Sequence, residues 1–162
     1  LAVVIGIDSL LNMNSYKARE KALSLLIQIA GRSGRNGFGE VLIETKNEEF
    51  FKYYLEESNY KEFLKSELEF RKDLYPPFVK LARVVLSSTN GLKIKEELNE
   101  IVKDLKNNKD IEVVGFGECA IFKIANKYRY EVIIRSKEVK AILNALHYLK
   151  SSNISIDMDT IY

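Results

Sequence analysis

Cysteine is nearly absent from the sequence, because Cys119 is the only one among 162 residues. A single thiol excludes an internal disulfide bond and any zinc or iron–sulfur site with several thiolate ligands in this chain. It also fits a reducing compartment, so we expect a cytoplasmic protein. No apolar run approaches the ~20 residues that a membrane-spanning helix needs, because Asp8, Asn12 and Asn14 interrupt the apolar start. We therefore expect no membrane partner.

A strong excess of charge of one sign is also missing. The net charge is +2, with 46% hydrophobic and 30% charged residues, a composition typical of one globular domain or two small ones. Residues 1–75 carry 11 Lys/Arg against 12 Asp/Glu, and residues 76–162 carry 14 against 11, a difference of +3. This is far below the basic excess of a dedicated nucleic-acid binder, so charge alone assigns no partner.

The sequence of the first part of the chain indicates the end of an α/β domain. Residues 1–7 form a continuous β-branched apolar run, typical of a central strand buried on both faces. The next strand candidate, residues 40–45, supplies only one neighbour, so we expect a C-terminal fragment of a longer protein. A helix is predicted over residues 16–30, and four glycines between residues 31 and 39 predict a loop after it.

The second part begins after a helical connector. Residues 47–74 lack Gly and Pro and predict two helices separated near Ser58 and Asn59, and Pro76 and Pro77 end the second one. Beyond them the expected order is βαβββαβ, an α+β sandwich with one sheet covered on one side by two helices. The expected strands are 78–87, 111–114, 120–125, 128–135 and 154–158, and the expected helices are 92–105 and 137–149.

One motif indicates chemistry: Gln28-Ile-Ala-Gly31-Arg32-Ser-Gly-Arg35. Two arginines three residues apart in a glycine-bracketed loop present planar five-donor groups with little steric cover. Such groups match phosphate oxygens bidentately and stay charged at every relevant pH. The expected target is therefore a phosphate ligand. The alternatives are a solvated basic turn for the arginines and, for Gln28, a cap on a buried carbonyl.

This octet resembles the last signature motif of superfamily-two helicases, QxxGRxGR. The resemblance implies that Arg35 is an arginine finger on the terminal phosphates of ATP, with Arg32 as its partner, since a positioned guanidinium stabilises the charge of phosphoryl transfer. It also implies that Gln28 and Gly31 belong to the nucleotide site. The flanking segments 16–20, 39–45, 67–71, 75–78, 127–130 and 157–159 narrow the resemblance to the bacterial replication-restart helicases, the primosomal protein N′ family.

The resemblance covers the whole chain and implies three parts. Residues 1–46 would close the second RecA-like helicase lobe, 47–75 would connect, and 76–162 would be an α+β DNA-binding domain. The phosphate-binding loop GxxxxGK[ST] and an acidic magnesium motif are absent from the chain, so this fragment would be inactive alone. ATP and magnesium would belong to the complete protein and zinc to a segment outside this chain, with no cofactor or metal expected on this fragment.

The expected DNA-binding residues are Lys123, Lys127, Arg129 and Arg135, which lie on or between two neighbouring strands with Tyr128 and Tyr130. Basic and aromatic residues on a sheet grip single strands through phosphate contacts and base stacking. Strand alternation places the tyrosines on the opposite face from Arg129 and Arg135, so they could equally be core residues. The sequence leaves both interpretations open.

Three further features favour structural roles. Asp157 and Asp159 have no third oxygen donor beside them in the sequence and are interpreted as surface or salt-bridge residues rather than a cation site. His147 and Cys119 are interpreted as structural.

The resemblance implies an ATP-dependent 3′-to-5′ DNA helicase that restarts stalled replication forks. Its partners would be forked and single-stranded DNA, primosome proteins and single-stranded-DNA-binding protein. The alternative is a non-catalytic module that docks nucleic acid or protein.

Overall fold

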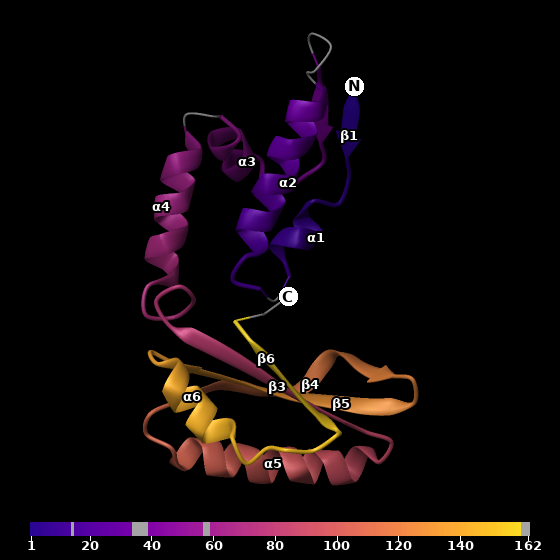
Figure 1. Ribbon diagram of the computed structural model, residues 1–162. Coiled ribbons are helices and arrows are strands. Elements are labelled where there is room, and N and C mark those ends of the chain that lie inside the picture. The colour runs from indigo at the N-terminus through magenta and orange to yellow at the C-terminus, as the bar shows by residue number, and fades with distance from the viewer. Residues whose placement is uncertain (14, 34–38, 57–58, 160–162) are drawn as a thin grey trace. The chain divides into compact units, whose positions relative to one another are not determined.

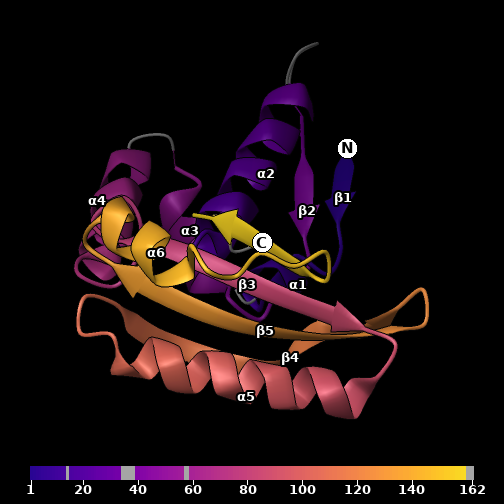
Figure 2. The same ribbon diagram turned by 60° about the horizontal axis from the view of Figure 1, so that its bottom comes forward.

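The computed structural model describes residues 1–13, 15–33, 39–56 and 59–159. The chain divides into two compact units, Leu1–Arg71 and Lys72–Thr160, here called the N-terminal and C-terminal units. Figures 1 and 2 show the elements of each unit from two directions. Within the described residues, no helix is long and apolar enough to cross a membrane.

The N-terminal unit joins a parallel strand pair to four helices (Figure 1). The strands are β1 (Ala2–Val4) and β2 (Val41–Ile43), and the helices are α1 (Asp8–Leu11), α2 (Ala18–Ser33), α3 (Glu48–Tyr54) and α4 (Tyr60–Arg71). Both connector helices and short forms of both expected strands are therefore present, whereas α1 was not expected. The prediction that the first strand is buried on both faces is wrong, because Val3 in the middle of β1 is 60% exposed. Phe51 of α3 and Phe63 of α4 lie in one core with Leu23 and Leu26 of α2. Helices α3 and α4 are thus part of this unit's core.

Helix α2 differs from its prediction in the residue at which it ends and in how far its side chains are exposed. The glycine cluster predicts a loop from Gly31, but the helix continues through Arg32 to Ser33. A helical glycine costs only ~1 kcal/mol relative to alanine, and the Ser33 hydroxyl donates to the Glu40 carbonyl at 3.2 Å, which ties the helix end to the residue before β2. Residues 23–30 are apolar nearly all round the helix, which predicts burial on all sides, yet Leu25 and Ile27 are 40% and 38% exposed.

The C-terminal unit is a four-stranded antiparallel sheet in the order β4-β5-β3-β6. Its elements in chain order are β3 (Lys80–Ser88), α5 (Gly91–Asn107), β4 (Glu112–Ile124), β5 (Lys127–Ser136), α6 (Val139–Leu146) and β6 (Ile154–Met158). Helices α5 and α6 cover one face of the sheet, as predicted (Figures 1 and 2).

The expected order βαβββαβ is wrong by one strand, and the observed order is βαββαβ. The sequence around Gly115 and Gly117 predicts a break, but β4 runs through it as one strand of 13 residues. Two register shifts against β5, between Val113 and Gly115 and between Glu118 and Lys123, absorb the irregularity. Because a bulge takes up extra residues without ending the ladder, the glycines bend the strand instead of dividing it.

The core of this unit follows from the periodicity of its elements. Alternate residues of β3 and β5 face α5 and α6, including Val84 and Val132, which are fully buried. Leu98 of α5 and Ile142 of α6 pack against them at helical spacing. Helix α5 begins at an N-cap, because the Asn90 side chain accepts from the Lys93 amide at 3.1 Å.

Candidate nucleic-acid interface and nucleotide motif

The first candidate site is the tip of the β4–β5 hairpin. Ala125 and Asn126 turn the chain with φ of 47° and 63°. Two successive positive φ values match the twist of the flanking strands, although alanine adopts them at an energetic cost. The turn sets Lys123 opposite Tyr128 and Ile124 opposite Lys127. It therefore brings three of the four predicted basic residues together at one end of the sheet.

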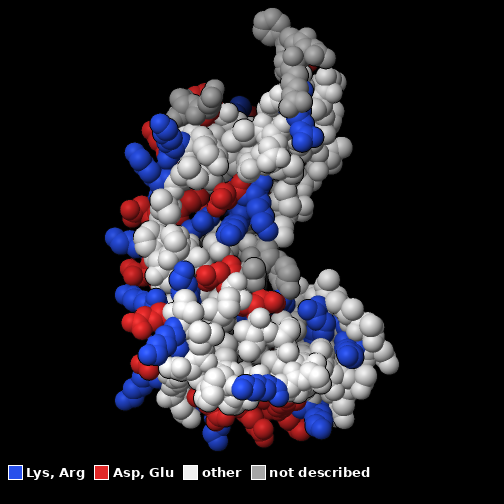
Figure 3. Space-filling model, in the orientation of Figure 1, with Lys and Arg blue, Asp and Glu red and all other residues white. Residues whose placement is uncertain are grey.

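Three of the predicted DNA-binding residues, Lys123, Lys127 and Arg129, lie at this end and are here called the tip cations. Figure 3 shows basic side chains over the hairpin end of the C-terminal unit. Among the described residues, no carboxylate lies within ion-pair distance of any tip cation. Arg129 donates from Nη1 to the Ile121 carbonyl at 3.4 Å. Because the carbonyl carries no net charge, this contact does not neutralise the guanidinium. The tip cations are therefore available to an anion.

Tyr130 is a core residue and Tyr128 is half-buried against the same core, which favours the core interpretation over base stacking. Tyr130 is 6% exposed and belongs to the core under α5 and α6. Tyr128 packs against the same core, and its ring contacts Phe122 at a centroid distance of 5.4 Å. Lys123 Nζ lies 4.6 Å from the centroid of the Tyr128 ring. Gly91 approaches that ring so closely that a Cβ there would lie 3.2 Å from it. Tyr128 therefore has little ring surface left for base stacking.

The fourth predicted DNA-binding residue, Arg135, has a different environment. Its Nε and Nη2 each donate to a Glu112 carboxylate oxygen at 2.8 Å, and its Nη1 donates to the Leu74 carbonyl at 3.4 Å. The hydrogen bonds from Arg135 lower the pKa of Glu112. A DNA phosphate would have to compete with this bidentate partner, so Arg135 is a weaker candidate than the tip cations.

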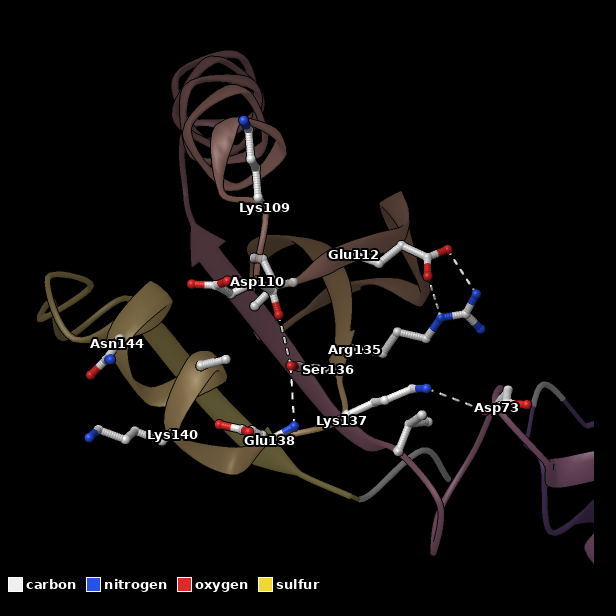
Figure 4. A pocket seen from close by; sticks show the side chains of 13 residues that line it. Asp73, Lys109, Asp110, Glu112, Arg135, Ser136, Lys137, Glu138, Lys140 and Asn144 are labelled. Atoms are coloured by element: carbon white, nitrogen blue, oxygen red, sulfur yellow. Dashed lines mark hydrogen bonds and ion pairs between the residues drawn. The ribbon is translucent and has the colours of Figure 1, made fainter.

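Arg135 also lines an open pocket of about 580 Å³ in the same unit (Figure 4). Four basic and four acidic side chains line it, and two of the basic ones are paired, Arg135 with Glu112 and Lys137 Nζ with Asp73 at 3.7 Å. A polyanion would meet as many negative as positive groups here. The pocket combines residues from distant segments, so no local sequence signal could have predicted it.

The second candidate site is the C-terminal end of α2. Gln28 and Arg32 lie one helical turn apart on its exposed surface, and Gln28 makes one long contact, from Nε2 to the Ser24 hydroxyl at 3.4 Å. Among the described residues, Arg32 has no ion-pair partner. The predicted finger, Arg35, lies outside the described residues.

Gly31 lies at this end of α2 with open space around its Cα. A Cβ built on Gly31 would meet nothing within 4 Å, so packing does not require glycine there. Glycine lowers helix stability by about 1 kcal/mol relative to alanine, and it leaves the backbone open to close approach. Gln28 and Gly31 also border an open, largely apolar groove of about 730 Å³, together with Ile27, Ile43 and Tyr60. The helix backbone beside Arg32 is therefore open at Gly31.

The remaining predicted residues have structural surroundings. Asp159 pairs with Lys80 Nζ at 3.7 Å and accepts from the Leu81 amide at 2.9 Å, so it is a salt-bridge partner as interpreted. His147 Nδ1 lies 2.7 Å from the Asn144 carbonyl. Cys119 is buried, and burial raises the pKa of its thiol. No group of three or more potential metal ligands occurs among the residues that the structure describes.

Two arrangements in the N-terminal unit were not expected as sites. Asp8 accepts hydrogen bonds from the Thr45 hydroxyl at 2.6 Å, the Lys46 amide at 2.7 Å and Asn47 Nδ2 at 3.0 Å, which lower its pKa. The segments 16–20 and 67–71, quoted above only for their resemblance, meet in a cluster of charged side chains. Their similarity to one family was the only signal that could have singled them out.

Comparison with known proteins agrees with the resemblance. The family model for the primosomal protein N C-terminal domain matches residues 72–161. Curated relatives named "Replication restart protein PriA" include one from Helicobacter pylori, 36% identical over 99% of this chain, and one from Bacillus subtilis, 30% identical over 98% of it. The matched regions are 26% and 22% of those relatives' lengths, so the chain spans about a quarter of them. The chain therefore belongs to the family of the primosomal protein N C-terminal domain, whose model its residues 72–161 match.

Proposed function

We propose that this chain is the C-terminal portion of an ATP-dependent 3′-to-5′ DNA helicase that restarts stalled replication forks by primosome assembly. In this proposal the C-terminal unit binds forked and single-stranded DNA through the tip cations. The end of α2 supplies Gln28, Gly31, Arg32 and Arg35 to the nucleotide site of the complete protein. The family relation supports the proposal, because the curated relatives are named for replication restart.

One observation carries the DNA-binding part. Arg83 on β3 and Arg135 near the other end of β5 are paired with carboxylates, whereas the described structure places no carboxylate within ion-pair distance of the tip cations. Cations on one hairpin that have no carboxylate beside them in the described structure attract a polyanion without first breaking an internal ion pair. Because Tyr128 and Tyr130 are packed in the core, the expected contacts are with phosphates, and sequence-independent binding follows.

The test is binding of a fluorescent dT20 oligonucleotide to the 162-residue chain, measured by anisotropy between 50 and 200 mM salt. Each phosphate contact to a single strand contributes about 0.7 to the slope of log K against log salt, so replacing all three tip cations by alanine lowers the slope by about 2. Lys103→Ala, an exposed lysine on α5, is the matched control and leaves the slope unchanged. If the chain fails to bind at low salt, DNA binding is refuted and the module docks a protein instead.

The nucleotide part of the proposal depends on the exposed end of α2. Arg32 is free of internal ion pairs within the described structure, and Gly31 leaves the backbone open, so these residues fit a phosphate-bearing ligand. ATP and magnesium would supply the phosphoryl-transfer chemistry of the complete protein. Arg32 would hold phosphate oxygens, and Arg35 would face the charge that develops on the transferred group.

Arg35→Ala and Arg32→Ala in the complete protein test this assignment. Loss of a positioned guanidinium lowers turnover by about 10³-fold or more in well-studied cases, so we expect DNA-stimulated ATP turnover to fall by that order while DNA binding is kept. Lys21→Ala, near the opposite end of α2, is the control and retains turnover. Unchanged turnover in Arg35→Ala would refute the finger role.

Primosome proteins and single-stranded-DNA-binding protein are the further partners in this proposal. An activity on chromosomal DNA in bacteria would place the protein in the cytoplasm.

A further inference from the structure

Helices α2 and α4 are joined by four charged side chains, here called the α2–α4 ion network: Arg19, Glu20, Glu67 and Arg71. Glu67 lies between the two arginines, with Oε1 2.9 Å from Arg19 Nη1 and Oε2 3.5 Å from Arg71 Nη2. Arg71 Nη2 also lies 2.7 Å from Glu20 Oε2 and 3.5 Å from the Tyr16 carbonyl oxygen. The charges alternate in sign and sum to zero.

The network is buried at its centre. The side chains of Glu67 and Arg71 are 3% and 10% exposed, and Arg71 also lies against the Tyr16 ring at 5.1 Å from its centroid. On the same helix, Leu64 and Leu68 are 38% and 44% exposed. Helix α4 therefore buries two charges while apolar side chains of the same helix remain at the surface.

Stability alone does not account for this arrangement. Replacing a buried ion pair by packed apolar residues is often neutral or stabilising, so a buried network is weak support for a stabilising role. Its geometry instead specifies one register: sliding α4 by one turn, about 5.4 Å, would separate Arg71 from both Glu20 and the Tyr16 carbonyl. The network thus fixes the position of α4 along α2.

The α2–α4 ion network joins the helix that carries Arg32 to the last residue before the C-terminal unit. Glu20 lies in the first turn of α2, and Arg32 lies in the last turn, twelve residues or about 18 Å further along one rigid helix. Arg71 is the last residue of α4 and directly precedes Lys72, the first residue of the C-terminal unit. One network therefore links the helix that bears the nucleotide motif to the segment that enters the DNA-binding unit.

We propose that Arg71, through Glu67 and Glu20, is a positioning residue that couples DNA binding by the C-terminal unit to the nucleotide motif at the end of α2. This inference rests on the proposed function. A pull on the start of the C-terminal unit reaches α2 through the ion pairs, and a packed helix transmits a displacement at one end to the other. Breaking the network uncouples the two sites without touching either.

The first test uses hydrogen exchange in the 162-residue chain with and without dT20. In the wild type, DNA is expected to change the exchange of amides in the last turn of α2 by about fivefold or more, the lower end of typical coupling between sites. The double variant Glu67→Gln with Arg71→Met removes both buried charges, so that neither is left unpaired. It is expected to bind dT20 within twofold of the wild type while losing the exchange response.

Two further variants separate positioning from folding. Glu20→Gln changes only the half-exposed end of the network and is expected to weaken the response, and Glu69→Gln, an exposed carboxylate on α4, is the control that keeps it. In the complete protein, the double variant is expected to keep basal ATP turnover within twofold while its stimulation by DNA falls about fivefold or more.

The outcomes distinguish this inference from the proposed function. If the wild-type chain does not bind dT20, the proposed function fails and the coupling fails with it. If DNA binds but leaves the exchange of α2 unchanged, or changes it equally in the wild type and the double variant, the coupling alone is overturned. A double variant that is merely less stable, with its response to DNA intact, also overturns it.

Discussion

Glu131→Gln is expected to destabilise the protein strongly, because it removes the negative charge from the carboxylate that pairs with the buried Arg83. Arg83 is 6% exposed, and its Nε and Nη2 lie 2.6 and 2.5 Å from Glu131 Oε2. Removing one partner of a buried pair costs 3–5 kcal/mol, and the amide oxygen still accepts a hydrogen bond, so we expect about 3 kcal/mol. A unit of this size loses about 4 °C or more in Tm per kcal/mol, so the Tm should fall by about 12 °C.

The pair Arg135–Glu112, whose carboxylate is largely exposed, is the control for this experiment. Its Glu112 side chain is 61% exposed, and exposed pairs contribute about 0–1 kcal/mol, so Glu112→Gln should shift the urea midpoint only slightly. The double variant Arg83→Met with Glu131→Leu replaces both buried charges and should stay within about 1 kcal/mol of the wild type. Urea denaturation and thermal melts, both followed by circular dichroism, measure all three. Equal losses for Glu131→Gln and Glu112→Gln would refute the reasoning, since burial would then make no difference.

Two further predictions concern the local structure. The pKa of Asp8 is lowered mainly by the hydrogen bond from Thr45, so its contribution to stability is present above the ordinary carboxyl pKa and is lost as pH falls through the lowered value. Thermal melts from pH 7 to pH 2 should therefore show a steeper acid loss for the wild type than for Asp8→Asn, and parallel curves would exclude this role. Asn90→Ala removes the N-cap of α5 and should cost about 1 kcal/mol in urea denaturation, whereas the exposed Asn107→Ala at the other end should change stability by less than about 0.5 kcal/mol.

Most helices and strands were predictable, because local patterns determine them, although the short helix α1 was not expected. Helix α5 follows from an apolar stripe at helical spacing after an N-cap residue, and β6 follows from an alternation of apolar and polar residues, so both lie close to their predicted positions. The prediction divided β4 into two strands, which is wrong. Glycines such as Gly115 and Gly117 occur both in bulges and in turns, so the local sequence does not distinguish the two. Only pairing with β5 distinguishes the two.

The candidate sites also depend partly on local sequence and partly on long-range contacts. The sequence by itself identified the motif at the end of α2, the basic residues of the hairpin and the family, since these depend on residue types at fixed spacing. Only the tertiary structure decided that Arg135 is paired with Glu112, and that Tyr128 packs against Gly91 and the core. It alone placed Glu67 and Arg71 against the start of α2. The physical reason is that pairing and burial depend on which distant residues meet, and residue spacing along the chain does not carry that information.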